Sequence, residues 1–266
     1  MQGQGGATRF KELRFTLILA QSLRISKSPK VAHYAYYHVD LNAGGGYNTE
    51  VDVAGSPLNF LDAAARNQRP NFYAFFIDRD PACIEALIER PEILRADASL
   101  ISIHLGDNSE LLPTVAQFIA ARERPRYAMG SVLIDPNGYH SGVPWAALRT
   151  FCKAHPCMDV VMNLNVRTYQ MARPHIITGT WKGRELHPIS SFPSVFSRPH
   201  CMVTEVCQIK GDRFIQFVGR SMRTSSPDYR SIGFYDLASE RGQRIVAEIE
   251  KSDPPASSQL ALLPVV

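Results

Sequence analysis

Residues 34–46 read YAYYHVDLNAGGG, an apolar run that ends near Asp40 and continues into a loop with three consecutive glycines. A run of this kind, bounded by turn residues, predicts a strand covered on both faces of a sheet. Glycines lack a Cβ and therefore let the backbone approach a ligand closely. The loop is not the dinucleotide fingerprint G-x-G-x-x-G, since Tyr47, Asn48 and Thr49 follow where the third glycine belongs.

The strand-like pattern recurs further along the chain, with helix-like segments between the strands. The further strand-like segments are residues 71–78, 100–105, 130–135 and 158–164. Strands joined by helices of about 10–15 residues predict a parallel sheet with helices on both faces. The expected fold class is α/β, a doubly wound Rossmann-like sheet that is mostly parallel, with ligands beyond the carboxyl ends of its strands.

Two dipeptides predict helix starts within this pattern. In Ser56-Pro57 and in Asp80-Pro81 a capping residue precedes a proline, which is favoured in the first turn of a helix. We therefore expect Ser56 and Asp80 to be the N-caps of the helices that follow.

The pattern changes after the fifth strand. Residues 166–198 are rich in Arg, His and Pro, which predicts a short helix and a long loop that form an insertion facing the substrate. Residues 200–209 and 213–219 flank the turn sequence KGD at 210–212, which predicts a C-terminal antiparallel hairpin. A further helix is expected near residues 235–251.

The chain divides into a leading segment, one domain and a tail. Residues 1–30 contain a leading helix, since apolar residues recur at helical spacing between residues 10 and 25. Residues 31–250 show no repeat and no second core, so we expect a single α/β domain there. Residues 251–266 are rich in Ser and Pro and are expected to form a flexible tail.

Composition narrows the class of protein. The 266 residues carry 29 Lys and Arg against 25 Asp and Glu, a net charge of +4, which permits an acidic partner such as nucleic acid without requiring one. The five cysteines form no C-x-x-C pair, which argues against a disulfide framework and favours a cytoplasmic protein. No apolar run reaches about 18 residues, so we expect no membrane span.

An acidic residue follows each of four successive strands. These residues are Asp40, Asp78, Asp107 and Asp135, and parallel strands bring their carboxyl ends to one edge of a sheet. Clustered like charges cost free energy unless they meet donors. The edge therefore favours a ligand with a ribose, an adenine and a cationic end over one rich in phosphates. Asp107 is equally suited to cap the helix after it.

This pattern of acids and glycines resembles that of the class I S-adenosylmethionine-dependent methyltransferases over residues 34–165. In that superfamily the loop after the first strand surrounds the methionine part of the cofactor, the next acid binds the ribose, and the third acid lies by the adenine. The resemblance implies S-adenosylmethionine as the cofactor. The cofactor-binding residues that it implies are Asp40, Asn42, Ala43, Gly44, Gly46, Asp78, Asp107 and Asn108.

A closer resemblance is to the three-Cys-motif partner proteins (TcmP), which are methyltransferase-like bacterial and phage-associated proteins. Their pattern is DLFAGPG, GSPL, DPFG and GVPW. The matching segments here are VDLNAGGG (39–46), AGSPLNFLDAA (54–64) and VLIDPNGYHSGVPWAAL (132–148), with MDVVMNLNVRTYQMAR (158–173) after them. This chain departs from the pattern at Asn42 and Gly45, where the family has an aromatic residue and a proline.

The segment after the fourth strand suggests the chemistry. Amino-methyltransferases that act on bases carry [DNS]-P-P-[YFW] there; the first side chain accepts hydrogen bonds from the target amino group and the aromatic ring stacks on the base. Asp135 and Pro136 match this tetrad, Asn137 and Gly138 depart from it, and Tyr139 offers a ring one residue later. The predicted catalytic residues are therefore Asp135, Pro136, Asn137 and Tyr139, and a duplex base would have to be flipped out.

Cations and aromatic residues alternate in 166–198, which suits phosphate contacts and base stacking with DNA or RNA. The predicted substrate-binding residues are Arg167, Tyr169, Arg173 and Trp181. The other cations of the insertion and its neighbour are His175, Lys182, Arg184, His187, Arg198 and His200, and Arg220, Arg223 and Arg230 form a second cluster. The histidines lack the paired spacing of metal ligands, so no metal is expected.

The leading hypothesis is methyl transfer from S-adenosylmethionine to an amino group of a nucleic-acid base. The alternative is a methyltransferase-like binding or adaptor protein without turnover, with a protein partner, because the tetrad is imperfect and the resembled family consists of partner proteins. A nucleotide-binding oxidoreductase is a third possibility, which the missing third glycine disfavours.

Overall fold

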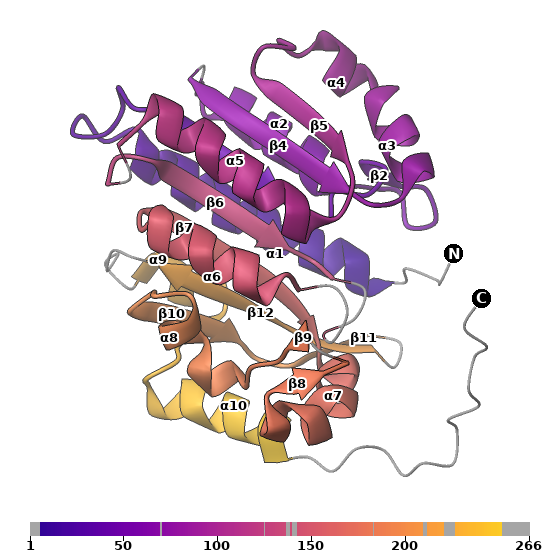
Figure 1. The fold of residues 1–266 in the computed structure, drawn as a ribbon, viewed down its shortest axis with the longest axis vertical. Helices are drawn as coiled ribbons and strands as arrows, with labels where there is room; N and C mark the ends of the chain where they lie inside the picture. Colours follow the sequence, from indigo (N-terminus) through magenta and orange to yellow (C-terminus); the bar gives the residue numbers. More distant parts are fainter. Residues whose placement is uncertain are drawn as a thin grey trace.

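In the part of the chain that the structure describes, nine strands form one sheet in the computed structural model (Figure 1). The strand order is β13-β10-β12-β7-β6-β1-β4-β5, and β11 pairs with β12 beside this path. The described residues are 6–69, 71–124, 126–136, 139, 143–182, 184–209, 212–220 and 227–251. This arrangement confirms the predicted doubly wound α/β sheet, which is mostly parallel with antiparallel strands toward the C-terminus.

Five strands form the parallel part of the sheet. Each pairs in parallel with its neighbour, because the connections between them are long enough for the chain to cross back before the next strand. Every residue of β1 is buried, so both faces of the sheet are covered there. The strands are β1 (Tyr36–Asp40), β4 (Phe72–Asp78), β5 (Ile101–Leu105), β6 (Met129–Ile134) and β7 (Met158–Asn165).

Helices cover both faces of the sheet (Figure 1). On one face, Phe15 and Phe60 from α1 and α2 pack in one cluster with Phe76 of β4. On the other face, α5 and α6 form a second cluster, in which Ile119 packs with Val132 of β6 and its neighbours. The helices are α1 (Gly6–Ser26), α2 (Ser56–Arg66), α3 (Pro81–Ile88), α4 (Pro91–Arg95), α5 (Asn108–Arg122) and α6 (Trp145–Ala154).

The antiparallel part of the sheet is joined to the parallel part by β12. This strand runs antiparallel to β7, from Phe214 opposite Asn165 to Gly219 opposite Val160, and β10 lies between β12 and β13. The elements of this region are α7 (Val166–Thr178), β8 (Thr180–Trp181), β9 (Arg184–Glu185), η1 (Ile189–Ser191), α8 (Phe192–Val195), β10 (His200–Thr204), β11 (Cys207–Ile209), β12 (Asp212–Arg220), α9 (Pro227–Arg230), β13 (Phe234–Asp236) and α10 (Glu240–Lys251).

The C-terminal element predictions need two corrections. The helix predicted from residue 235 begins at Glu240, because Asp236 ends β13 and its carboxylate accepts the Ala238 N–H at 2.8 Å in a turn. The strand predicted over 200–209 is divided into β10 and β11. The turn residues 210 and 211 and the tail from residue 252 lie outside the described residues.

The insertion at 166–198 is more regular than its composition suggests. In place of a short helix and a long loop it holds α7, the small β8–β9 hairpin and the short helices η1 and α8. Hydrophobic residues of this segment, among them Leu186, Ile189 and Phe192, are buried in the same cluster as α6. Burial of these side chains therefore orders a segment whose Arg, His and Pro residues suggested a long loop.

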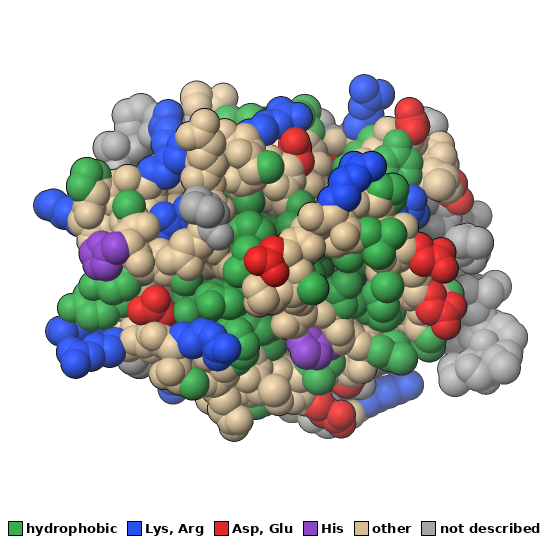
Figure 2. All heavy atoms as spheres, turned by 90° about the horizontal axis from the view of Figure 1, so that it is seen from above, with side chains coloured by type: hydrophobic (Ala, Val, Ile, Leu, Met, Phe, Trp, Pro, Cys, Tyr) green, Lys and Arg blue, Asp and Glu red, His purple; other side chains and the backbone are tan. Residues whose placement is uncertain are grey.

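The strand β5 is the outermost strand on one side of the sheet, and β13 is the outermost strand on the other. Figure 2 views the molecule from the β5 side and shows hydrophobic side chains gathered near the middle of the face. Ile88, Leu94 and Leu105 are exposed at or near this edge, Leu94 by 70%. Among the described helices, none has the length and apolar character needed to cross a bilayer.

Candidate functional site

The loop that follows β1 is held by Asp40, the last residue of that strand. The Asp40 carboxylate is fully buried; it accepts the Asn42 N–H at 3.1 Å and the Ser56 hydroxyl at 2.5 Å. Burial raises the pKa of Asp40 to about 7, and the carboxylates of Asp135 and Asp78 also favour its protonated form. Ser56 is therefore not the N-cap of α2, which is Gly55; instead it fixes Asp40.

The loop also contacts the end of the second parallel strand. Gly44 has φ +60°, which glycine adopts without strain, and its N–H donates to Asp78 at 2.8 Å. The other oxygen of Asp78 accepts the Asp80 N–H at 2.9 Å, and Asp80 caps α3 as predicted. A Cβ placed on Gly44 would meet no described atom within 4 Å, so the space beside this glycine is open.

The third strand contributes a helix start. Asp107 caps α5, accepting the N–H and the hydroxyl of Ser109 at 2.7 and 2.5 Å. Asn108 then donates to the Leu41 carbonyl at 3.0 Å, which ties this loop to the loop after β1. The capping role of Asp107 is therefore present, and its role toward a cofactor stays a prediction.

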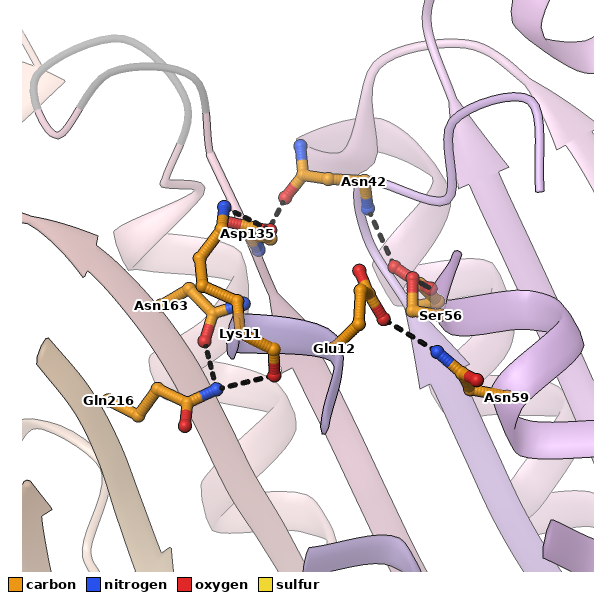
Figure 3. Close-up of polar contacts among 9 residues, drawn as sticks. Lys11, Glu12, Asn42, Ser56, Asn59, Asp135, Asn163 and Gln216 are labelled. Carbon is orange, nitrogen blue, oxygen red and sulfur yellow. Dashed lines mark hydrogen bonds and ion pairs between the residues drawn. The ribbon is translucent and has the colours of Figure 1, made fainter. Parts of the chain in front are cut away.

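Asp135, after the fourth parallel strand, is bound by a residue from the other end of the chain. Lys11 of α1 donates to both Asp135 oxygens, at 2.9 and 3.0 Å, in a partly buried ion pair (Figure 3). The Asp135 N–H donates to the side chain of Asn42 at 3.2 Å. Asn42, one of the departures from the resembled family, thus links the first and fourth strand ends.

Glu12, next to Lys11, also reaches this edge of the sheet. Its carboxylate accepts a hydrogen bond from the Asn59 amide of α2 at 2.8 Å (Figure 3). Burial raises the pKa of Glu12 to about 8, with a further contribution from Asp135 and a smaller one from Asp40, against the effects of Asn59 and Lys11. Glu12, Asp40 and Asp135 thus place three carboxylates near one another at this edge, which also carries Asp78.

A buried amide pair holds the N-terminal part of α1 against the sheet. Gln216 of β12 donates to the Lys11 carbonyl at 3.2 Å and to Asn163 of β7 at 2.7 Å (Figure 3). Neither Lys11 nor Glu12 was predicted from the sequence to be a site residue. One signal was present, because Glu12 is the only acidic residue before Asp40.

The structure corrects two predicted aromatic roles. Tyr139 is buried, its ring centroid lies 4.8 Å from that of Tyr169, and its hydroxyl donates to the His187 carbonyl, so its ring is not presented to a base. Tyr169 is also buried; its hydroxyl donates to Glu250 at 3.1 Å and ties α7 to α10. Both are core residues because a large apolar ring gains most from burial. Pro136 is buried and Asn137 lies outside the described residues.

The cations of the insertion and of the second cluster include both surface and core residues. Arg167 is exposed on α7 and Arg173 is partly buried there, whereas Trp181 lies in β8 and its side chain is outside the described set. Arg198 and Arg220 are buried. Arg198 donates to backbone carbonyls, and Arg220 pairs with Asp159 at 3.0 Å, so neither is available to a nucleic acid.

Neither a protein-family model nor a curated protein sequence matches the chain. Among solved structures, a Legionella pneumophila protein of family DUF519 superposes with a TM-score of 0.56 at 10% identity, over 92% of this chain and 94% of that one. Human methyltransferase-like protein 13 in complex with SAH superposes at 0.47 with 13% identity, over 96% and 97%. The N-terminal domain of EvdMO1, in the presence of SAH and D-fucose, gives 0.43 and 14%, over 77% and 83%.

These structural similarities concern the fold alone, because sequence identity to this chain is only 10–14%. The sheet has five parallel strands and an antiparallel strand, β12, between β7 and β10, in agreement with the mostly parallel α/β sheet predicted from the alternation of strand-like and helix-like segments. The chain has a doubly wound, Rossmann-like α/β fold, and the side chains described above lie at the carboxyl ends of its parallel strands.

Proposed function

We propose that the protein is a methyltransferase that uses S-adenosylmethionine. The observation that carries the proposal is the contact between Gly44 and Asp78 beside open space, at the carboxyl ends of two adjacent parallel strands. Ligands of doubly wound sheets bind at this edge. Two of the structurally similar proteins named above were solved with SAH.

The residues at the edge fit this cofactor. Asp78 presents a carboxylate suited to ribose hydroxyls, and the open Gly44 lets the ligand lie against the backbone. Burial, with a further contribution from neighbouring carboxylates, raises the pKa values of Asp40 and Glu12, and the ammonium group described near Glu12, that of Lys11, is paired with Asp135. A ligand with a sulfonium and an ammonium group supplies positive charge, which favours it over a phosphate-rich ligand.

The proposed acceptor is an amino group of a nucleic-acid base. Asp135 already binds the ammonium group of Lys11, so its carboxylate accepts N–H donors in this position. An acceptor amine that replaces Lys11 would be held by Asp135, and fixing its distance and orientation lowers the barrier to methyl transfer. Arg167, exposed on the helix after β7, is suited to a phosphate, and Arg173 lies partly buried on the same helix.

Calorimetric titration and thermal unfolding with S-adenosylmethionine and SAH test the cofactor. At about 100 times the dissociation constant, either ligand should stabilise the protein by about 2.7 kcal/mol. Asp78→Asn should weaken binding about tenfold or more, because it removes a charged acceptor. The control is Asp62→Asn, which alters an exposed acid on α2 and should bind normally. Absence of binding by either ligand at millimolar concentration contradicts the proposal.

Transfer of a labelled methyl group tests the acceptor. Single-stranded DNA, duplex DNA and RNA should be compared, and Asp135→Asn should reduce transfer while leaving SAH binding in place. If the cofactor binds and no methyl group is transferred to any of these nucleic acids, the proposed methyl acceptor is wrong. That result would favour an adaptor role.

A further inference from the structure

The Glu12 side chain lies close to the residues proposed to bind the cofactor and the methyl acceptor. Its side chain extends from α1 toward the ends of β1 and β6, and in Figure 3 it lies between the Lys11–Asp135 pair on one side and Ser56 and Asn59 on the other. Glu12 thus stands next to the group proposed to hold the acceptor. This position is set by the packing of α1 and not by any sequence motif.

Among the titratable groups that influence Glu12, acidic groups outnumber basic ones. The titratable groups that influence it are Lys11 on its own helix, Asp135 after β6 and Asp40 at the end of β1. Both oxygens of Asp135 bind the Lys11 ammonium. The described hydrogen-bond partner of Glu12 is the neutral amide of Asn59, so one ammonium faces three carboxylates.

The balance of these charges sets the proton occupancy of Glu12. Burial and the neighbouring carboxylates raise the pKa of Glu12 to about 8, so its protonated form predominates at neutral pH without further positive charge. A cation placed at this edge favours the ionised carboxylate and lowers that pKa. A neutral ligand of the same shape lacks this effect.

We propose that Glu12 is a catalytic residue that releases its proton when a sulfonium cation binds at this edge and takes up the proton that the acceptor nitrogen loses on methylation. This rests on the proposed function. The lone pair of the nitrogen forms the new N–C bond while the S–C bond breaks, and the electron pair of that bond stays on sulfur as a neutral thioether. The surplus proton of the nitrogen passes to the Glu12 carboxylate. One positive and one negative charge are removed together, so the net charge of the site is the same before and after transfer.

The test compares two ligands that differ by one methyl group and one positive charge. Calorimetric titration of the full chain with S-adenosylmethionine and with SAH, in buffers of different ionisation enthalpy, counts the protons released on binding. At pH 7 we expect S-adenosylmethionine to release up to about one proton more than SAH, because the rest of the two ligands is identical. Equal release by both ligands in the wild-type protein overturns the proposal.

Variants assign the proton to its residue. Glu12→Gln should abolish the difference between the ligands and still bind SAH, and the surface control Glu240→Gln should retain the difference. Asn59→Ala removes a hydrogen bond that favours the ionised form of Glu12 and so raises its pKa. The pH at which the difference in proton release between the two ligands is half-maximal should therefore rise. An unchanged midpoint in Asn59→Ala overturns the proposal even if Glu12→Gln does not fold.

Two further outcomes are separable. If the difference in proton release between the two ligands persists in Glu12→Gln and disappears in Asp40→Asn, the released proton comes from Asp40. Glu12 is then not the proton acceptor. If neither ligand binds the wild-type protein, the proposed function fails and this inference fails with it, whereas equal proton release with normal binding overturns this inference alone.

Discussion

At the scale of single residues, Arg198 shows that a cation in a basic segment can belong to the core. Its guanidinium is fully buried and donates to the carbonyls of Met158, Cys152 and His155 at 2.9, 3.1 and 2.9 Å. These carbonyls lie around the connection from α6 to β7, and the His155 carbonyl also accepts the Met158 N–H at 3.2 Å. The planar fork of arginine can serve several acceptors at once, which the single ammonium of lysine does not.

Arg198→Lys should therefore destabilise the fold by about 3 kcal/mol, because buried carbonyls lose hydrogen bonds from the guanidinium and the ammonium is harder to satisfy there. Urea unfolding monitored by circular dichroism measures the loss. Arg244→Lys, in an exposed ion pair on α10, is the matched control and should change stability by less than about 0.5 kcal/mol. Similar stability for the two variants would show that the Arg198 hydrogen bonds contribute little.

At the scale of elements, α1 both completes a core and places the candidate site residues. Phe15, Leu19 and Leu23 are buried at helical spacing on the face of the sheet that α2 also covers. The same packing places Lys11 and Glu12 at the carboxyl ends of the parallel strands (Figure 3). The helix that was expected as a leading segment is thus part of the domain.

Two leucines of α1 test this packing. Leu19 is 0% exposed and Leu13 is 58% exposed. Leu19→Ala should cost about 3 kcal/mol, since it removes buried methyl groups and leaves a cavity, whereas Leu13→Ala should stay within about 0.5 kcal/mol. Thermal unfolding of both variants checks the contrast. Equal stabilities would mean that α1 detaches from the sheet in solution.

At the scale of the whole molecule, one sheet passes through both hydrophobic clusters. The ladder between β7 and β12 joins the parallel part to the antiparallel part over six residue pairs. Trp145 of α6 is buried in the same cluster as Phe192 and Phe217, which come from the C-terminal half. We therefore expect α1 and the domain predicted over residues 31–250 to unfold together as one unit.

Unfolding in urea, followed by two spectroscopic probes, tests whether the two halves of the sheet unfold together. Tryptophan fluorescence and far-ultraviolet circular dichroism should give the same midpoint in urea, because Trp145 lies where the halves of the sheet share a core. Separate midpoints would indicate that the segment after β7 unfolds independently of the parallel strands.

Local sequence patterns predicted much of the parallel half of the fold. The apolar run ending at Asp40 and the later runs ending near Asp78 and Asp135 are short-range signals, and the helices between them leave few alternatives to a parallel sheet. The Asp80 cap was also predictable, since its partner Ala82 is two residues away. Gly44 and Asp78 could be assigned to one edge because parallel strands share their direction.

Other features depended on contacts between distant parts of the chain. The sequence suggested stacking for Tyr139 and nucleic-acid contact for Arg198, but burial decided both roles. Ser56 looked like a cap, and its hydroxyl binds Asp40 instead because the loop after β1 folds back on α2.

The amino-acid order by itself determined the doubly wound sheet and the acidic edge, because strand periodicity and turn residues act over a few positions. Only the tertiary structure decided that Lys11 and Glu12 complete that edge. They lie 124 and 47 positions from their partners Asp135 and Asn59, and such pairs form only after α1 has packed on the sheet. Burial there, which no linear pattern records, also gives Glu12 its affinity for a proton.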